Sequence, residues 1–231
     1  MRGAPLIRSD WRDLGAGRPD RECSRPCRRD EKELFAMIND ARFADALNKI
    51  DEANAQDPRI ENAAGSSQPR ELLFSRRVFE WVQKLVSAPS EELLLSARAH
   101  TLKRWEIPRD RYPKTTVGYH EWRDACAEHH ADEAARILRN AGYDEEMIAR
   151  VSGFITRTNW PGDAEACALE DADCLVFLET KLAKYLDEWD EEKTLRILKR
   201  SFKKMTPQAR ELAKAMPLDS KCRAVLARAL A

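Results

Sequence analysis

The sequence predicts an all-α fold, with one multi-helix domain over about residues 33–231. Three observations support this prediction. Apolar residues recur at helical spacing from Leu34 onward, cap and breaker residues divide them into helix-length segments, and no segment alternates as a strand would. We find no repeat of about 20–50 residues, which argues against a solenoid.

The N-terminal half is expected to hold five helices. Apolar residues from Phe35 to Ile50 mark the first, and breakers from Gln56 to Arg70 mark a loop. The stripe from Val78 to Val86 gives a second helix, and Ser90 is a plausible N-cap for a third over 91–104. After a loop over 105–118, a fourth helix is expected over 119–140 and a fifth, capped by Asp144, up to Ile155.

The C-terminal half is also expected to be helical. Asn159 to Gly162 interrupts the pattern, and a long helix is predicted over 164–189. A helix over 191–204 follows, Thr206-Pro207 restarts helix in the favoured order of cap and proline, and residues 224–230 close the chain.

Composition supports a folded chain without membrane segments. Of 231 residues, 43% are hydrophobic and 35% charged, enough to build a core. No apolar run approaches the roughly 18–20 residues of a membrane-spanning helix. The start lacks the apolar stretch of a secretory signal. We therefore expect a cytoplasmic protein with no membrane partner.

Residues 1–32 differ from the rest of the chain. They contain three prolines, nine basic and six acidic residues, and no sustained period. We expect a disordered, Arg-rich N-terminal extension, and Met37 is an alternative start because it opens the better-patterned region. Six cysteines occur, and two of them, Cys126 and Cys174, lie in helical apolar patterns. Buried reduced thiols are the expected state.

Three polar side chains fall where helical phase requires a core residue. His100 shares a stripe with Leu93 and Ala97, and His130 lies four residues after Cys126. Asp171 is in phase with apolar residues later in its helix, whereas Asp173 is expected to face solvent. A buried carboxylate is costly unless it is paired or binds a cation, so His100, His130 and Asp171 form a candidate site. The alternative is that each is a core residue with ordinary hydrogen-bond partners.

Charge is distributed unevenly along the chain. Residues 70–114 carry ten basic and six acidic groups, and residues 161–192 carry two basic and eleven acidic groups. Arginine beside an inward histidine suits a phosphate-like anion. Alternatively, the basic region docks on the acidic helix through surface ion pairs. The candidate ligand-binding residues are Arg76, Arg77, Arg104, Trp105 and Arg109.

Segments around these residues resemble the HD phosphohydrolase superfamily. Residues 94–104 are similar to its "A-x-L-H-D-I-G" helix, residues 129–138 to its later His-bearing helix, and residues 169–175 to its final "D-A-D-x-L" helix. The resemblance implies an all-helical fold in which His and Asp hold a divalent metal, such as Mn, Fe, Zn or Mg, for phosphate-ester hydrolysis.

A closer resemblance is to domain-of-unknown-function family 4202 (DUF4202), from about residue 38 to the C-terminus. It is carried by Pro69 to Arg77, by His100 with Arg104 to Arg109, and by Tyr112-Pro113, Gly118-Tyr119 and Gly142 to Glu145. Glu170-Asp171, followed by residues 174–179, completes the pattern. This family implies no activity.

The sequence departs from the active HD pattern at two ligand positions. Ser75 stands at the first-His position and Thr101 at the Asp of the His-Asp pair. His100, His130 and Asp171 (or Asp173) are the remaining candidates for the metal and for catalysis, and stable metal sites usually need three or more protein ligands.

Three functions therefore remain open. The first is a metal-dependent phosphohydrolase acting on a nucleotide or other phosphorylated small molecule. The second is an inactive HD-like module that binds an anionic, nucleotide-like ligand without metal. The third is a nucleic-acid or translation factor. It is suggested by Lys203 to Thr206, which weakly resemble a loop of class I tRNA synthetases. The zero net charge argues against this function, because nucleic-acid binders usually carry a basic excess.

Overall fold

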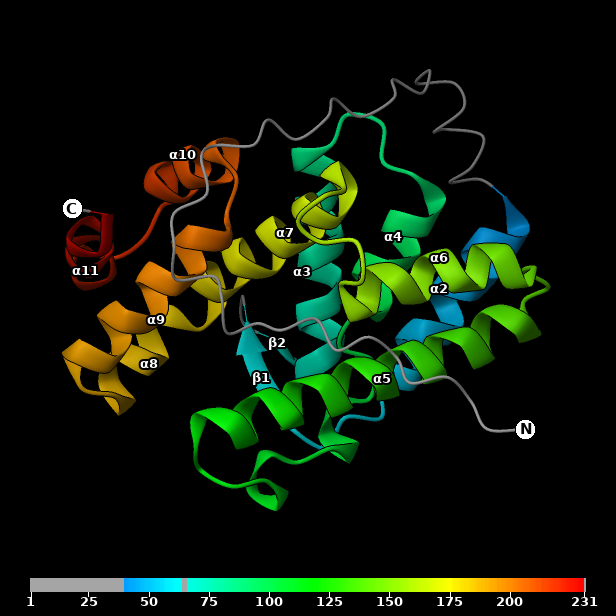
Figure 1. The fold of residues 1–231 in the computed structure, drawn as a ribbon, viewed down its shortest axis with the longest axis horizontal. Helices are drawn as coiled ribbons and strands as arrows, with labels where there is room; N and C mark the ends of the chain where they lie inside the picture. Colours follow the sequence, from blue (N-terminus) through cyan, green and yellow to red (C-terminus); the bar gives the residue numbers. More distant parts are fainter. Residues whose placement is uncertain (1–39, 64–65, 231) are drawn as a thin grey trace.

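The all-α prediction is confirmed by the computed structural model, which describes residues 40–63 and 66–230 (Figure 1). The N-terminal extension predicted over 1–32 lies outside these residues. The elements of the N-terminal half are α2 (Ala41–Asn54), β1 (Ile60–Ala63), β2 (Ser66–Pro69), α3 (Arg70–Leu85), α4 (Glu91–Ala99), η2 (Arg104–Glu106), η3 (Arg109–Arg111), α5 (Thr116–Asn140) and α6 (Glu145–Thr156). Those of the C-terminal half are α7 (Ala164–Thr180), α8 (Leu182–Glu188), α9 (Glu191–Lys204), α10 (Pro207–Ala215) and α11 (Ser220–Leu230).

Side-chain caps begin most of these helices. Ser90 accepts from the Leu93 amide at the start of α4, and Asp144 accepts from the Met147 amide at the start of α6. Thr206 accepts from the Ala209 amide and is followed by Pro207 in the first turn of α10. These contacts satisfy amides that have no partner within the helix. The three starts predicted from cap residues are thereby confirmed.

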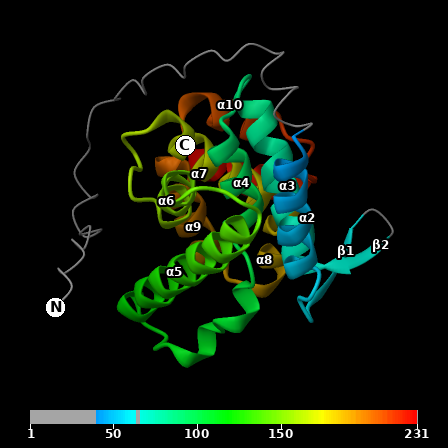
Figure 2. The same ribbon diagram turned by 90° about the vertical axis from the view of Figure 1, so that its right-hand side faces the viewer.

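Helices α3 and α7 lie in the middle of the molecule and pack against each other (Figures 1 and 2). Helices α2, α4, α5 and α6 gather on one side, and α8 to α11 gather on the other. Each side has its own hydrophobic core. Residues of α7 enter both: Ala172 and Val176 belong to the first core, and Leu175 and Leu178 to the second. Helix α7 is therefore buried around most of its circumference.

Four details differ from the sequence prediction. The expected loop over 56–70 contains an antiparallel hairpin, in which Ile60 pairs with Pro69 and Ala63 with Ser66. Four-residue strands rich in polar residues are too short to give an alternation signal. Helix α4 ends at Ala99 instead of residue 104, and the backbone turns left-handed at Lys103, with φ 54°. The helix expected over 164–189 is divided at Lys181, and the last helix begins at Ser220.

Two further expectations can be compared with the structure. Cys126, Cys167, Cys174 and Cys222 are buried, as predicted for Cys126 and Cys174 from helical phase. Within residues 40–63 and 66–230, no helix has both the length and the apolar character needed to cross a bilayer.

Candidate functional site

His100 caps the C-terminus of α4 and pairs with Asp173 of α7. Its Nδ1 lies 3.2 Å from the Ala97 carbonyl oxygen, and its Nε2 lies 3.3 Å from Asp173 Oδ1. Both neighbours are acceptors, so a ring nitrogen of His100 contacts its neighbour as a hydrogen-bond donor. The side chain of Asp173 is 30% exposed. The expectation that Asp173 simply faces solvent is therefore wrong.

Asp173 belongs to a network of charged groups at the centre of the fold. Arg157, in the left-handed conformation at the end of α6, lies 3.8 Å from Asp173 and 2.6 Å from Glu170. Lys204 of α9 lies 2.8 Å from the other Glu170 oxygen. Burial by itself would raise the pKa of Asp173, but the His100 hydrogen bond and the Arg157 charge hold that pKa well below its usual range. Asp173 and Glu170 are thus anchored as carboxylates.

His130 of α5 is a neutral buried imidazole. Its Nδ1–H donates to the Leu102 carbonyl oxygen at 2.6 Å. In the neutral ring Nε2 is therefore the unprotonated nitrogen, which can accept a hydrogen bond. Nε2 is buried and has no hydrogen-bond partner in the described part of the chain. Burial, and then the charge of Arg104, lower the pKa of His130 well below its usual value. The Thr101 hydroxyl is also buried without a described partner.

Asp171 joins α7 to α10 and is not the partner of His100. Its carboxylate accepts from the Thr206 amide at 2.9 Å and from the Thr206 hydroxyl at 2.5 Å. Burial raises the pKa of Asp171 to about 6, against the effect of the Thr206 hydrogen bonds. The predicted group of His100, His130 and Asp171 is therefore corrected: Asp173 takes the place beside His100 that was assigned to Asp171.

Three half-buried cations act on groups in or next to the His100–Asp173 pair, and none forms an ion pair with a carboxylate in the described residues. Arg104 packs over the Trp122 ring, and its charge acts on His130, Cys126 and Lys181. The charge of Arg123 of α5 acts on Glu170 and Asp173.

Lys181, at the break between α7 and α8, is the third cation. Its Nζ lies 4.0 Å from the centroid of the Phe74 ring, and that ring also contacts His100 at 5.8 Å. Burial lowers the pKa of Lys181 to about 8 against the charge of Glu71, and the charges of Arg70 and Arg104 act in the same direction as burial. The repulsion of Lys181 by Arg70 and Arg104 indicates a positive potential at this end of the site.

The other predicted ligand-binding residues lie in different surroundings. Arg76 binds Asp51, and Arg77 binds Glu80 and approaches Glu179. Arg109 donates to the carbonyl oxygens of Tyr112 and Pro113, so it holds its own loop. Trp105 is half-buried in η2 next to Arg104. Of the five, only Arg104 has a described contact to the central site.

The side chains at this site do not fit a metal. Within residues 40–63 and 66–230, no three His, Cys, Asp or Glu side chains are grouped so that they could hold an ion. Ser75, at the first ligand position of the HD pattern, donates to the Leu72 carbonyl oxygen and accepts from Asn54. The Arg157 guanidinium lies close to Asp173. Two protein ligands beside a fixed cation are too few for a stable site.

One comparison with known proteins gives a match. Residues 44–226 match the model of a family described as a domain of unknown function, DUF4202. The chain belongs to this family. No curated protein and no solved structure matches it significantly. Membership of DUF4202 confirms the resemblance seen in the sequence, and the resemblance to the HD superfamily remains an expectation.

Arg123 and Lys181 were not identified as site residues from the sequence, although helical spacing could have indicated Arg123. Arg123 precedes Cys126 by three residues and His130 by seven, so it lies on their side of α5. Lys181 carried no such signal, because it stands where α7 and α8 break the helical phase.

Proposed function

We propose that this DUF4202 protein is a metal-independent binding module for a small phosphorylated anion, such as a nucleotide or another phosphate ester. One observation carries the proposal: the charge of Arg123 acts on Asp173, the charge of Arg104 acts on His130 and Lys181, and Lys181 packs on the Phe74 ring that also contacts His100. None of the three cations forms an ion pair with a carboxylate among the described residues.

Half-buried cations that form no ion pair are costly to a fold unless an anion accompanies them. A phosphate group would offset their repulsion, since guanidinium groups bind phosphate oxygens in pairs and the lysine ammonium adds a point charge. The nearby carboxylates do not compete for these cations, because His100, Arg157 and Lys204 already hold Asp173 and Glu170. Phe74 and Trp122 supply apolar surfaces beside the cations.

The alternative is a metal-dependent phosphohydrolase, which the resemblance to the HD superfamily implies. It needs a metal-bound water held by three or more protein ligands. The engagement of Ser75, Asp171 and Asp173 with other protein groups favours binding over hydrolysis.

Calorimetric titration of the whole protein with inorganic phosphate, pyrophosphate and ADP tests the proposal. We expect at least one of them to bind equally well with EDTA and with MnCl₂. Lys181→Met should weaken binding about 10- to 100-fold, the range for losing a charged hydrogen bond. Lys184→Met is the matched control, because Lys184 is an exposed neighbour on α8 that faces Glu188.

The result that would overturn the proposal is equal binding by wild type and Lys181→Met, or binding that requires metal. Phosphate release from the same ligands in the presence of Mn²⁺, together with tightly bound metal in protein purified without chelator, would favour the hydrolase instead.

A further inference from the structure

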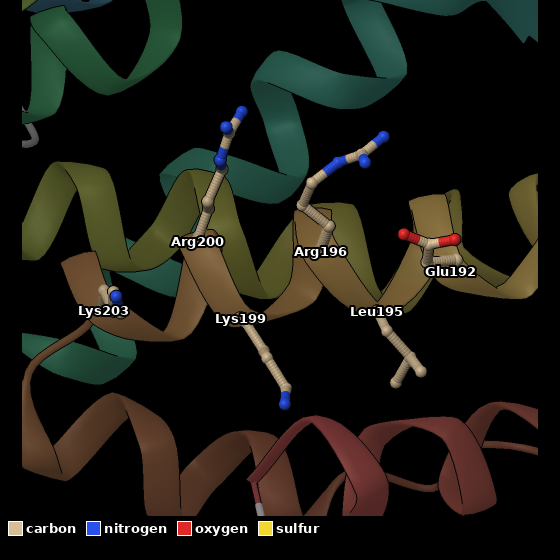
Figure 3. A pocket seen from close by; sticks show the side chains of 6 residues that line it. All are labelled: Glu192, Leu195, Arg196, Lys199, Arg200 and Lys203. Atoms are coloured by element: carbon tan, nitrogen blue, oxygen red, sulfur yellow. The ribbon is translucent and has the colours of Figure 1, made fainter. Parts of the chain in front are cut away.

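Helix α9 carries an exposed row of four cations. Arg196, Lys199, Arg200 and Lys203 follow the spacing i, i+3, i+4 and i+7, which places them on one side of the helix. With Glu192 and Leu195 they line a shallow surface pocket of about 430 Å³ (Figure 3). Arg196 and Arg200 extend together from one edge of α9, and Lys199 extends from the other. We name these four residues the α9 basic row.

These cations differ from several other cations on helices of the same protein. Five lysines and arginines on other helices have an acidic partner one turn away, in the pairs Lys49–Asp45, Arg77–Glu80, Arg136–Glu133, Lys184–Glu188 and Lys214–Glu211. In the α9 basic row no ion pair forms with any described residue. The like charges one turn apart instead repel each other.

One acidic residue, Glu192, lies in the same pocket four residues before Arg196, and a single carboxylate cannot neutralise four cations. The other acidic groups nearby have partners of their own. Asp187 is paired with Lys221, Glu188 with Lys184, and Glu191 with Arg228. If a second copy of the chain used these acidic residues to bind the α9 basic row, their existing ion pairs would have to break. Binding of a polyanion from outside the protein breaks none of these ion pairs.

The opposite side of α9 restricts the kind of polyanion. Thr194, Leu198 and Phe202 are buried in the second core. No apolar side of α9 is left to enter a bilayer, whereas an interfacial helix needs one.

The four cations span about 10 Å along the helix axis, at 1.5 Å per residue. A nucleic-acid duplex presents about one negative charge per 1.7 Å of its axis. An extended acidic peptide presents at most one carboxylate per residue, which is about one charge per 3.3 Å. The duplex therefore has the higher density of negative charge.

We propose that the α9 basic row is a contact surface for the phosphate backbone of a nucleic acid. We expect this surface to bind nucleic acid without preference for base sequence, because it offers cations for phosphate groups and no adjacent row of groups for base recognition. It is separate from the central cations, since Lys204, which turns inward from the same helix, is bound to Glu170. The inference does not depend on the proposed function of that central site.

The test is fluorescence anisotropy with a labelled 20-base-pair DNA duplex at 50 to 200 mM NaCl. Four phosphate contacts predict that log K falls with log salt with a slope of about −3 to −4. The double variant Arg196→Gln/Arg200→Gln should make that slope shallower by about 2. The control Lys184→Gln/Lys214→Gln removes the same charge from exposed lysines and should leave the slope unchanged. Lys181→Met should leave it unchanged as well.

Several results would overturn the proposal. One is that the duplex does not bind at 50 mM NaCl. Another is that the control double variant loses as much affinity for the duplex as Arg196→Gln/Arg200→Gln, because such a result would show that only net charge matters. Polyglutamate that competes as well as the duplex would indicate an acidic protein partner. Stronger binding to phosphatidylserine vesicles than to DNA would indicate a membrane surface.

Discussion

At the scale of single residues, three carboxylates within four positions of α7 have different partners. Successive residues on a helix point about 100° apart. Glu170 therefore reaches Arg157 and Lys204, Asp171 reaches Thr206, and Asp173 reaches His100. Burial raises the pKa of all three, but two have cationic partners and one has only a hydroxyl and an amide. This difference explains why only the pKa of Asp171 ends above its usual value.

Lys181 should make anion binding depend on pH. Since its pKa lies at about 8, the ammonium loses its proton as pH rises from 7 to 9. Sulfate keeps a constant charge over this range, so its affinity for wild type should fall. Lys181→Arg stays charged and should bind sulfate with little change up to pH 9. Calorimetry at pH 7, 8 and 9 measures this, and a parallel decline in both proteins would contradict it.

His130 should make the fold sensitive to acid. Its pKa is depressed in the folded state, so below about pH 6.5 the unfolded chain binds a proton that the folded chain does not. The free energy of unfolding should therefore decrease as pH falls from 7 to 5, by up to about 1.4 kcal/mol per pH unit for this proton. His130→Gln should remove that part of the slope in urea unfolding, and the exposed His120→Gln should not. Equal slopes in His130→Gln and wild type would refute this assignment.

At the scale of elements, the Asp171–Thr206 contact joins α7 to α10. Thr206 uses its hydroxyl both as the cap acceptor for α10 and as a donor to Asp171. Because α9 precedes this residue directly, the contact also fixes where α9 ends. A sequence pattern identifies the cap, since capping is local, but not the carboxylate 35 residues away that orients it.

Thr206→Val should therefore cost more than an ordinary cap. Loss of a cap alone costs about 1 kcal/mol, and the variant also leaves a buried Asp171 oxygen without its donor, which adds about 1–3 kcal/mol. Thr206→Ser retains the hydroxyl and should cost well under half as much. Urea unfolding at pH 7.5 gives both values. Similar losses for the two variants would contradict this, because they would mean that the methyl group of Thr206 contributes as much as its hydroxyl.

At the scale of the whole molecule, the sequence predicted the helices better than the site. Cap residues and 3.6-residue periodicity are local signals, so the starts at Ser90, Asp144 and Thr206 were found. The break at Lys181 and the left-handed turn at Lys103 were not found. Neither a proline nor a glycine marks those positions.

The site was predicted only in part, because it depends on distances between helices. Periodicity identified His100, His130 and Asp171 as buried but could not tell which polar partner each would face. It placed Asp173 toward solvent, since Asp173 is in phase with Thr180 and Lys184, although His100 lies opposite it. Net charge does not show where charges lie on the surface, because opposite charges in separate regions cancel in the sum and not in space.

The two cores should unfold as a coupled pair, because α7 contributes to both. Leu175→Ala removes a fully buried side chain from the second core and should cost about 2–5 kcal/mol. We expect native-state hydrogen exchange to show lost protection in α9 and also in α4, which packs on the other side of α7. Leu212→Ala, a partly buried position on α10 at the edge of the second core, should cost less and leave α4 protected. If Leu175→Ala weakens only α8 to α11, the first core is independently stable and α7 does not transmit the change between the cores.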